Sequence, residues 1–334
     1  MYSDKGGMTV QKAARMIYNQ KRNLILILVI IAIGAVFQFI NPAYLRMSNI
    51  ASIFSGYAVY GIMSVGMMFV ISTGNIDVSV GAQMAVVSMV ISTLVANGIV
   101  NSTIPTVLVC ILTGLALGLI NGLLVAFLKL PAIIVSLGTM NIMRGIMLLI
   151  LGSSWISGLP AWFTAIARTM PLGLRFKMTA YIWLLISVLS FLLMNYTILG
   201  RKILAVGANP DGASRIGFRP AMVYTFVFAV MGITSGLGAL YYTANVGIAQ
   251  PVAGSGYEMT LIAAVVIGGT SFSGGKVSVL GTFLGVLLLS MIESGMVISK
   301  VPVYWQEMVK GSVIILAIVS AAVEKLPGAA LKKR

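Results

Sequence analysis

Ten apolar stretches, separated by short polar ones, run along almost the whole chain. Most approach the length of about 20 apolar residues that a helix needs to cross a bilayer. They lie at 24–40, 51–72, 78–97, 104–128, 132–152, 180–199, 220–243, 258–272, 277–298 and 303–323. The stretch 258–272 is brief and runs into glycines, so nine spans or a re-entrant segment there is the alternative. The pattern predicts an all-α polytopic membrane protein of about ten transmembrane helices.

The composition excludes an ordinary soluble enzyme. Of the 334 residues, 59% are hydrophobic and 9% are charged, whereas a soluble domain is about half apolar and a quarter charged. Histidine is absent, and Cys110 is the single cysteine. These counts exclude histidine acid–base chemistry, an intrachain disulfide and a cysteine-rich metal site. We therefore expect no catalytic and no metal-binding residues.

The net charge of +15 would suggest a nucleic-acid partner in a soluble protein. In a membrane protein the same excess reports orientation. With ten spans and a cytoplasmic N-terminus, fifteen of the 22 Lys and Arg residues fall on the cytoplasmic side and five on the outer side. This is the bias of the positive-inside rule. We expect both termini in the cytoplasm and no nucleic-acid partner.

The predicted inner loop, residues 200–219, reads GRKILAVGANPDGASRIGFR. Asn209 is a favourable N-cap, Pro210 suits the first helical position, and Asp211 complements the helix dipole. These signals predict a short helix over about 210–216. Its end would present Arg215, Ile216, Gly217 and Phe218. Such a helix is suited to dock in a groove of a partner protein, and a plain surface turn is the alternative.

Four polar residues at or near membrane depth are candidates for a solute path. Asn75 and Asp77 lie in a glycine-flanked turn, 73–81, where the helix is expected to break. Irregular backbone at this depth is tolerated where it packs in protein or lines a water-filled path. The alternative for Asp77 is a turn at the inner surface in which it caps the following helix. Ionisable groups in spans usually face a cavity or a partner.

The other two candidates are Glu293 and Arg144, which fall in the middle of the stretches 277–298 and 132–152. Glu293 has no evident local partner, so we expect Arg144 to neutralise Glu293 or Asp77. Glu307 and Lys310 are three residues apart and are expected to pair on one helical face.

Several motifs resemble the ribose-type ABC importer permeases, the membrane subunits of bacterial sugar uptake systems. They are STGNIDVSVG at 72–81, KLPAIIVSLGTMNIMRG at 129–145, the loop 200–219, and QPVAGSGYEMTLIAAVVIGGTSFSGGKVSVLG at 250–281. The resemblance runs from about residue 24 to 325. The family pattern usually has a second glycine where Asn75 stands, which puts the substrate in doubt more than the fold.

The resemblance implies a type II importer-like permease domain over 24–325, between a cytoplasmic tail at 1–23 and a basic tail at 326–334. It also implies that the protein is located in the bacterial inner membrane. The loop 200–219 would couple to a dimer of ABC ATPase subunits, which would bind ATP and magnesium in place of this chain. A periplasmic binding protein and a second permease copy or close paralogue would be the other partners. The implied cargo is a monosaccharide such as a ribose-like pentose.

The chain itself carries no complete nucleotide-binding motif. In Gly269–Lys276 the lysine stands one position too late for a P-loop, and Val277 replaces the hydroxyl residue. These glycines favour a tight helix–turn–helix instead. The alternative functions are an ion-coupled secondary transporter using Asp77 and Glu293 at the midplane, and a membrane scaffold without transport.

Overall fold

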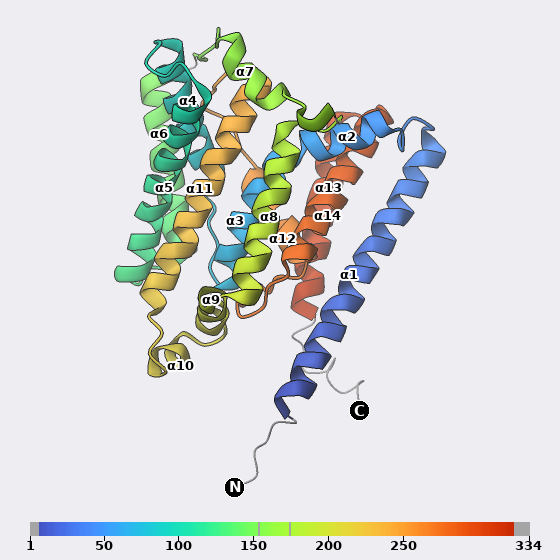
Figure 1. Ribbon diagram of the computed structural model, residues 1–334, viewed down its shortest axis with the longest axis vertical. Helices are drawn as coiled ribbons and strands as arrows, with labels where there is room; N and C mark the ends of the chain where they lie inside the picture. The colour runs from blue at the N-terminus through green and yellow to red at the C-terminus, as the bar shows by residue number, and fades with distance from the viewer. Residues whose placement is uncertain (1–6, 153, 174, 324–334) are drawn as a thin grey trace.

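The computed structural model describes residues 7–152, 154–173 and 175–323, which are almost entirely helical (Figure 1). The predicted all-α membrane fold is confirmed. The helices are α1 (Gly7–Ile40), α2 (Met47–Gly56), α3 (Ala58–Ser72), α4 (Val80–Ala96), α5 (Thr103–Phe127), α6 (Ala132–Leu151), α7 (Ala161–Arg168), η1 (Pro171–Gly173), α8 (Met178–Tyr196), α9 (Ile198–Ala208), α10 (Pro210–Arg215), α11 (Pro220–Val246), α12 (Tyr257–Ile267), α13 (Val279–Ile298) and α14 (Val303–Val323).

All ten predicted stretches are helical, but two of them are too short to cross a membrane alone. In the described part of the chain, α1, α5, α6, α8, α11 and α13 are long and apolar enough to do so, and α2 with α3 forms a seventh candidate, bent by 44°. By contrast, α4 has 17 residues and α12 has 11. At about 1.5 Å per residue, α12 covers roughly half of a 30 Å hydrocarbon core. The full span expected at 258–272 is therefore wrong.

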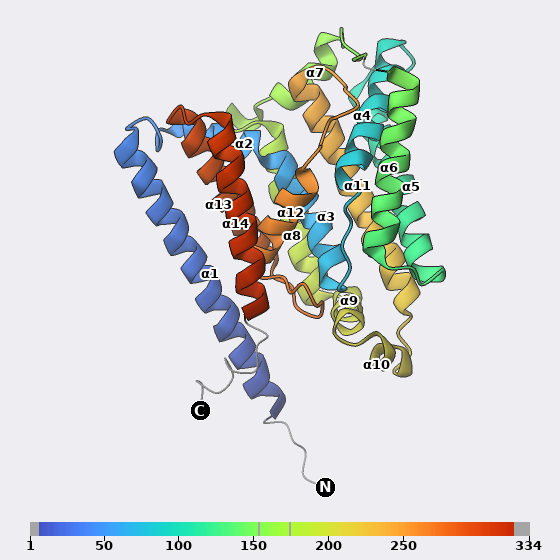
Figure 2. The same ribbon diagram turned by 180° about the vertical axis from the view of Figure 1, so that it is seen from behind.

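Non-helical backbone completes the path of each short helix. Residues 73–79 rise from the end of the molecule that carries α9 and α10 to the start of α4, near mid-height (Figure 2). Residues 247–256 descend from the opposite end to the start of α12. The second segment touches the first turn of α4, because a Cβ on Gly81 would lie 2.0 Å from the carbonyl oxygen of Gly254. Residues 247–256 and the start of α4 thus meet inside the helical body.

The connections between helices separate into two layers. Those at 128–131, 197–219 and 268–278 lie at the end that carries α10, as do the start of α1 and the end of α14 (Figure 1). The connections at 41–46, 97–102 and 299–302, together with α7, lie at the opposite end. This arrangement places Lys129, Lys276 and the basic residues around α10 on one side, in keeping with the charge bias that oriented the chain.

Helices extend through two of the segments that the sequence analysis delimits. The division between a tail at 1–23 and a first span falls inside α1, which begins at Gly7 and is continuous to Ile40. Most of the predicted inner loop 200–219 is helical, since α9 occupies 198–208 and α10 occupies 210–215. The break before α9 is at Thr197, whose hydroxyl accepts a hydrogen bond from the Gly200 amide at 3.1 Å. Helical structure in both segments therefore includes charged residues that lie outside the apolar stretches.

Small residues allow α5 and α11 to pack with their backbones in contact. A Cβ on Gly232 would lie 2.1 Å from the carbonyl oxygen of Gly114, and one on Gly118 would lie 2.3 Å from that of Phe228. Glycines four apart on facing helices are a general device for close packing in membranes, where apolar burial between helices gives little driving force. The exposed apolar side chains of the outer helices are left to face lipid, among them Leu24, Ile31, Leu112, Leu149 and Leu189.

We predict that Gly232→Ala destabilises the protein by about 1–3 kcal/mol, because the added methyl group meets backbone that has no free rotamer. The melting temperature of the purified protein in detergent measures this. Gly138→Ala is the matched control, since a Cβ there meets nothing within 4 Å. Equal melting temperatures for the two variants would show that the α5–α11 contact tolerates a wider spacing.

Candidate functional site

The segment around α10 has the local structure that the sequence predicts. The Asn209 side chain caps the helix by accepting a hydrogen bond from the Gly212 amide at 2.9 Å, and Pro210 follows it. Gly217 ends the segment with a φ of +87°, a conformation that favours glycine. Ile216, which is 68% exposed, projects from this end of the molecule. A short capped helix therefore offers an apolar tip beside charged residues.

The tip also has a fixed internal support. The Lys202 ammonium lies 5.7 Å from the centre of the Phe218 ring, a cation–π distance that ties α9 to the end of α10. Ala213 is buried, and Asp211 and Arg215 stand in the first and last turns, where each charge complements the helix dipole. The segment is thus a preformed structure in this chain.

The helix α9 connects this segment to the end of α3, where the non-helical residues 73–79 begin. A Cβ on Gly207 would lie 2.0 Å from the carbonyl oxygen of Ser72, the last residue of α3. That same oxygen accepts a hydrogen bond from the Gly275 amide at 2.9 Å. Three chain segments therefore meet through backbone atoms, without side chains between them. A displacement of α9 must act on the start of 73–79 and on the α12–α13 connection.

Asp77 lies in a closed network at the start of α4 and is fully buried. Its carboxylate accepts hydrogen bonds from the Ser79 amide at 2.9 Å, the Ser79 hydroxyl at 2.5 Å and the Gln83 amide at 3.1 Å. Asn121 of α5 donates to the Ser79 hydroxyl at 2.8 Å. Asp77 therefore organises the beginning of α4, and it does so in the protein interior rather than at the inner surface.

Asn75 lies nearer the inner end of the same segment and is half-buried. Its side-chain amide donates to the Thr73 hydroxyl at 3.0 Å. Asn75 thus stabilises the turn that follows α3 and makes no hydrogen bond to Asp77 among those found in the described residues. That Asn75 and Asp77 line a solute path stays a prediction.

Arg144 does not pair with Glu293 or Asp77, so that expectation is wrong. Its guanidinium donates to the backbone carbonyls of Pro251 and Ala253, at 2.9 Å in the latter case. These carbonyls belong to the non-helical segment before α12, where no helical partner exists for them. A backbone carbonyl at membrane depth needs a donor from within the protein. Arg144 supplies that donor.

A second arginine holds the other end of α12. Arg22 of α1 donates to the carbonyls of Val266 and Ile267 at 2.7 Å and 3.1 Å. The last carbonyls of a helix have no partner within it, and a cation there also complements the helix dipole. Sequence reasoning missed this role because Arg22 precedes the apolar stretch and looked like part of a basic tail. Arg22 therefore holds the far end of the short helix α12, and Arg144 holds the non-helical segment that leads into it.

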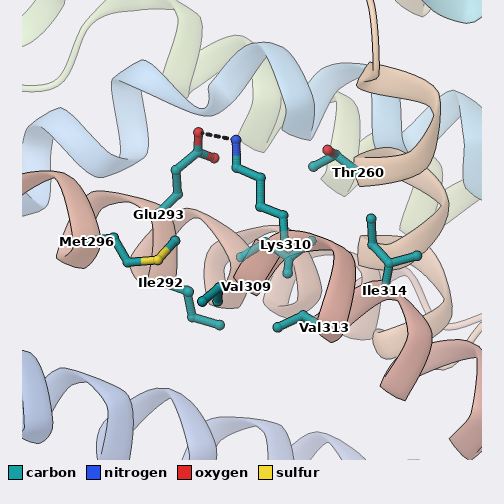
Figure 3. Close-up of a pocket in the computed structure, with 9 residues that line it drawn as sticks. Thr260, Ile292, Glu293, Met296, Val309, Lys310, Val313 and Ile314 are labelled. Atoms are coloured by element: carbon teal, nitrogen blue, oxygen red, sulfur yellow. Dashed lines mark ion pairs between the residues drawn. The ribbon is translucent and has the colours of Figure 1, made fainter. Parts of the chain in front are cut away.

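Glu293 pairs with Lys310 of α14, whose ammonium lies 2.9 Å from its carboxylate (Figure 3). Lys310 also lies 3.2 Å from Glu307, which confirms the predicted local pair. The ion pair lies beside a small cavity of about 20 Å³ between α12, α13 and α14, otherwise lined by Thr260 and by apolar side chains. Of the four path candidates, Glu293 is the one that reaches a pocket among those found in the described residues.

The four path candidates are thus not brought together into one site.

The connection between α6 and α8 carries the helix α7, at the end of the molecule opposite α10. There α7 buries Phe163 against the body, and Ile156 forms a β-bridge with Ala249 at the entrance to the non-helical segment before α12. Trp155 stays exposed, whereas Trp162 packs edge-on against Phe163.

Comparison with known proteins identifies the family. Residues 49–318 match the model described as branched-chain amino acid transport system / permease component. The chain belongs to this permease family. The predicted resemblance to ABC importer permeases is confirmed at this level, as is a multi-pass protein of the bacterial inner membrane. A transport component rather than an enzyme is the expectation that this membership supports.

Curated relatives are similar to this protein over most of its length. It is 32% identical to the autoinducer 2 import system permease protein LsrC of Yersinia enterocolitica over 293 residues, covering 88% of this chain and 80% of that one. It is 33% identical to the LsrC protein of Salmonella typhimurium, covering 87% and 83%. For the LsrC protein of Escherichia coli the identity is 32% over 300 residues, covering 89% and 86%. No solved structure matches the chain.

We predict that Arg144→Gln lowers the free energy of unfolding by about 1.5–3 kcal/mol, because hydrogen bonds from a charged group to two buried carbonyls are lost. Thermal melting in detergent reports the loss. Arg168→Gln, at an exposed position at the end of α7, is the control and is expected to melt like the wild type. If both variants melt alike, the segment 247–256 is held without Arg144.

Proposed function

We propose that this chain is the permease subunit of an ATP-binding-cassette importer for a monosaccharide or a closely related small polar solute. The observation that carries the proposal is the preformed α9–α10 segment. It presents Ile216 at the end of the molecule where most of the basic connecting residues lie, and its helix α9 contacts the backbone where Ser72 and Gly275 meet. A partner that moves this segment moves the broken segments beyond it. The chain therefore has both a docking tip and a mechanical connection to its interior.

The proposed partners follow from this division of labour. A dimer of ABC ATPase subunits would bind the α10 tip and would hold the ATP and magnesium, since this chain has only an incomplete P-loop at Gly269–Lys276. A periplasmic binding protein would deliver solute at the end that carries α7. A second copy of the chain, or a close paralogue, would complete the permease.

Two observations bear on the cargo. The curated relatives are named for import of autoinducer 2, and the family description names branched-chain amino acids. A ribose-like pentose is our first candidate, and autoinducer 2 is the alternative that the relatives favour. The test compares uptake of a ribose-like pentose with uptake of autoinducer 2 in cells that express the complete system and lack other routes for either compound. The compound taken up faster is the cargo.

An ion-coupled secondary transporter is the competing function. It needs coupling carboxylates that can take up and release an ion at the midplane. Asp77 has its carboxylate engaged by three hydrogen-bond donations, and Glu293 is paired with Lys310. Both carboxylates that the competing function would use are therefore already engaged by protein partners. Solute uptake driven by a proton or sodium gradient, in liposomes that hold the purified chain alone, would establish the competing function instead.

We predict that Ile216→Asp reduces uptake and co-purification with the ATPase subunit roughly tenfold or more, because truncating or charging a central apolar contact costs about 2 kcal/mol or more. The control is Ile99→Asp. Ile99 is exposed to the same extent, 68%, but lies in the 97–102 connection at the opposite end. Uptake that survives Ile216→Asp at normal protein levels would remove α10 as the docking site.

A further inference from the structure

A cavity between α2, α8 and α13 is much larger than the two cavities next to Glu293. It holds about 270 Å³, whereas those two hold about 20 and 10 Å³. Each of the three helices packs against the other two, and Figure 1 shows α8 on the face turned to the viewer, with α2 beside its upper end. Pockets that enclose a whole ligand hold about 300–1,000 Å³. This cavity can therefore hold part of a molecule whose remainder lies outside it.

The walls of the cavity are mainly aromatic. The rings come from Phe54 of α2, from Phe176, Tyr181 and Trp183 in and just before α8, and from Phe283 of α13. The Trp183 indole stacks on the Phe283 ring at 4.3 Å, and Phe54 meets Phe176 edge-on at 5.9 Å. Trp183 also fits against α3, where a Cβ on Gly61 would lie 2.2 Å from the indole. Apolar cavities of this kind stay dry and accept hydrocarbon.

The cavity lies at the depth where the acyl chains of a bilayer begin. The helix α8 is long and apolar enough to cross a membrane and begins at Met178. The lining residues 180–184 lie about 3–9 Å along the helix axis from that end. Leu184 is 52% exposed, and Val188 and Leu192, one and two turns further along the same face, are exposed as well. Hydrocarbon can therefore enter from the lipid side and continue along α8.

Two cations stand at the rim of the cavity. Arg175 and Lys177 flank Phe176 in the chain, directly before α8, and neither forms an ion pair within the described residues. The Lys177 ammonium donates to the neutral Asn245 side chain at 3.1 Å, and the Lys177 backbone amide donates to the Ser55 hydroxyl of α2 at 3.0 Å. The rim therefore carries two positive charges without a carboxylate partner, at the level of the lipid headgroups.

These charges select the occupant. A glycerophospholipid with an anionic headgroup brings negative charge to the rim and hydrocarbon to the cavity, and basic residues beside a span attract such lipids. A second copy of the chain that used this face symmetrically would place the same two cations opposite their own copies, which repel each other. The combination of an apolar cavity and a cationic rim therefore favours an anionic lipid over a second copy.

We propose that the cavity between α2, α8 and α13 binds one acyl chain of an anionic glycerophospholipid, whose phosphate group contacts Arg175 and Lys177. The lipid fills the space between three helices that otherwise leave a void. This site goes beyond the importer function proposed above and does not depend on the cargo.

The test uses the fluorescence of Trp183, which lines the cavity but is only 2% exposed. The full chain carries Trp155→Phe, Trp162→Phe and Trp305→Phe, so that Trp183 is the remaining tryptophan. It is placed in phosphatidylcholine nanodiscs that contain rising fractions of phosphatidylglycerol whose acyl chains are brominated close to the ester. Bromine quenches an indole at contact. We expect quenching that saturates at a lower fraction of brominated phosphatidylglycerol than of brominated phosphatidylcholine.

The rim is tested by Arg175→Gln and Lys177→Gln. We expect each variant to lower the preference for phosphatidylglycerol over phosphatidylcholine by roughly fivefold, the effect of one basic residue near the membrane surface. Arg168→Gln is the matched control, because Arg168 is an exposed cation at the same end of the molecule, and it is expected to keep the full preference. Equal quenching by the two lipids in the parent chain, or an unchanged preference in both rim variants, overturns the proposal.

The cavity itself is tested by Ala180→Phe, because Ala180 lines it and a phenyl group there occupies the space of the acyl chain. We expect this variant to lose most of the quenching. Val188→Phe, on the same helix but outside the lining, is the control and is expected to keep the quenching. Equal quenching in these two variants, or no quenching of Trp183 in the parent chain, shows that no acyl chain enters.

A second copy of the chain is tested in the same nanodiscs. Disulfide-linked dimers of a Leu184→Cys variant would show that a second copy covers the cavity, and they would overturn the lipid site. Since solute uptake is not measured in these experiments, failure of the lipid site leaves the importer function standing.

Discussion

Backbone polar groups that leave a helix inside a membrane must find partners within the protein, and the architecture of this chain follows from that constraint. Residues 73–79 and 247–256 are non-helical at depth, and each leads into a short helix. The Asp77 network serves the first segment, and Arg144 serves the second. Arg22 then completes the far end of α12. Charged groups that look costly in a membrane are thus used to hold irregular backbone.

Close backbone contacts couple the segments of the helical domain rigidly to one another. Where Gly81 meets Gly254 and Gly207 meets Ser72, no side chain stands between the segments to absorb a displacement. Packed interiors move between discrete arrangements rather than deform gradually. The α9–α10 segment at one end and the contact between α4 and residues 247–256 are therefore parts of one connected structure. This is the property that an importer driven from its cytoplasmic loops requires.

The sequence by itself determined the helical class and the capped helix at Pro210–Arg215, because hydropathy and capping are local properties that neighbouring residues carry. It also marked the motifs of the permease family. Only the tertiary structure decided that 258–272 contains a half-length helix, that Arg144 and Arg22 hold backbone carbonyls, and that Glu293 pairs with Lys310. These partners lie between 17 and 245 residues apart in the chain. No local pattern specifies such contacts, since they depend on which helix faces meet after packing.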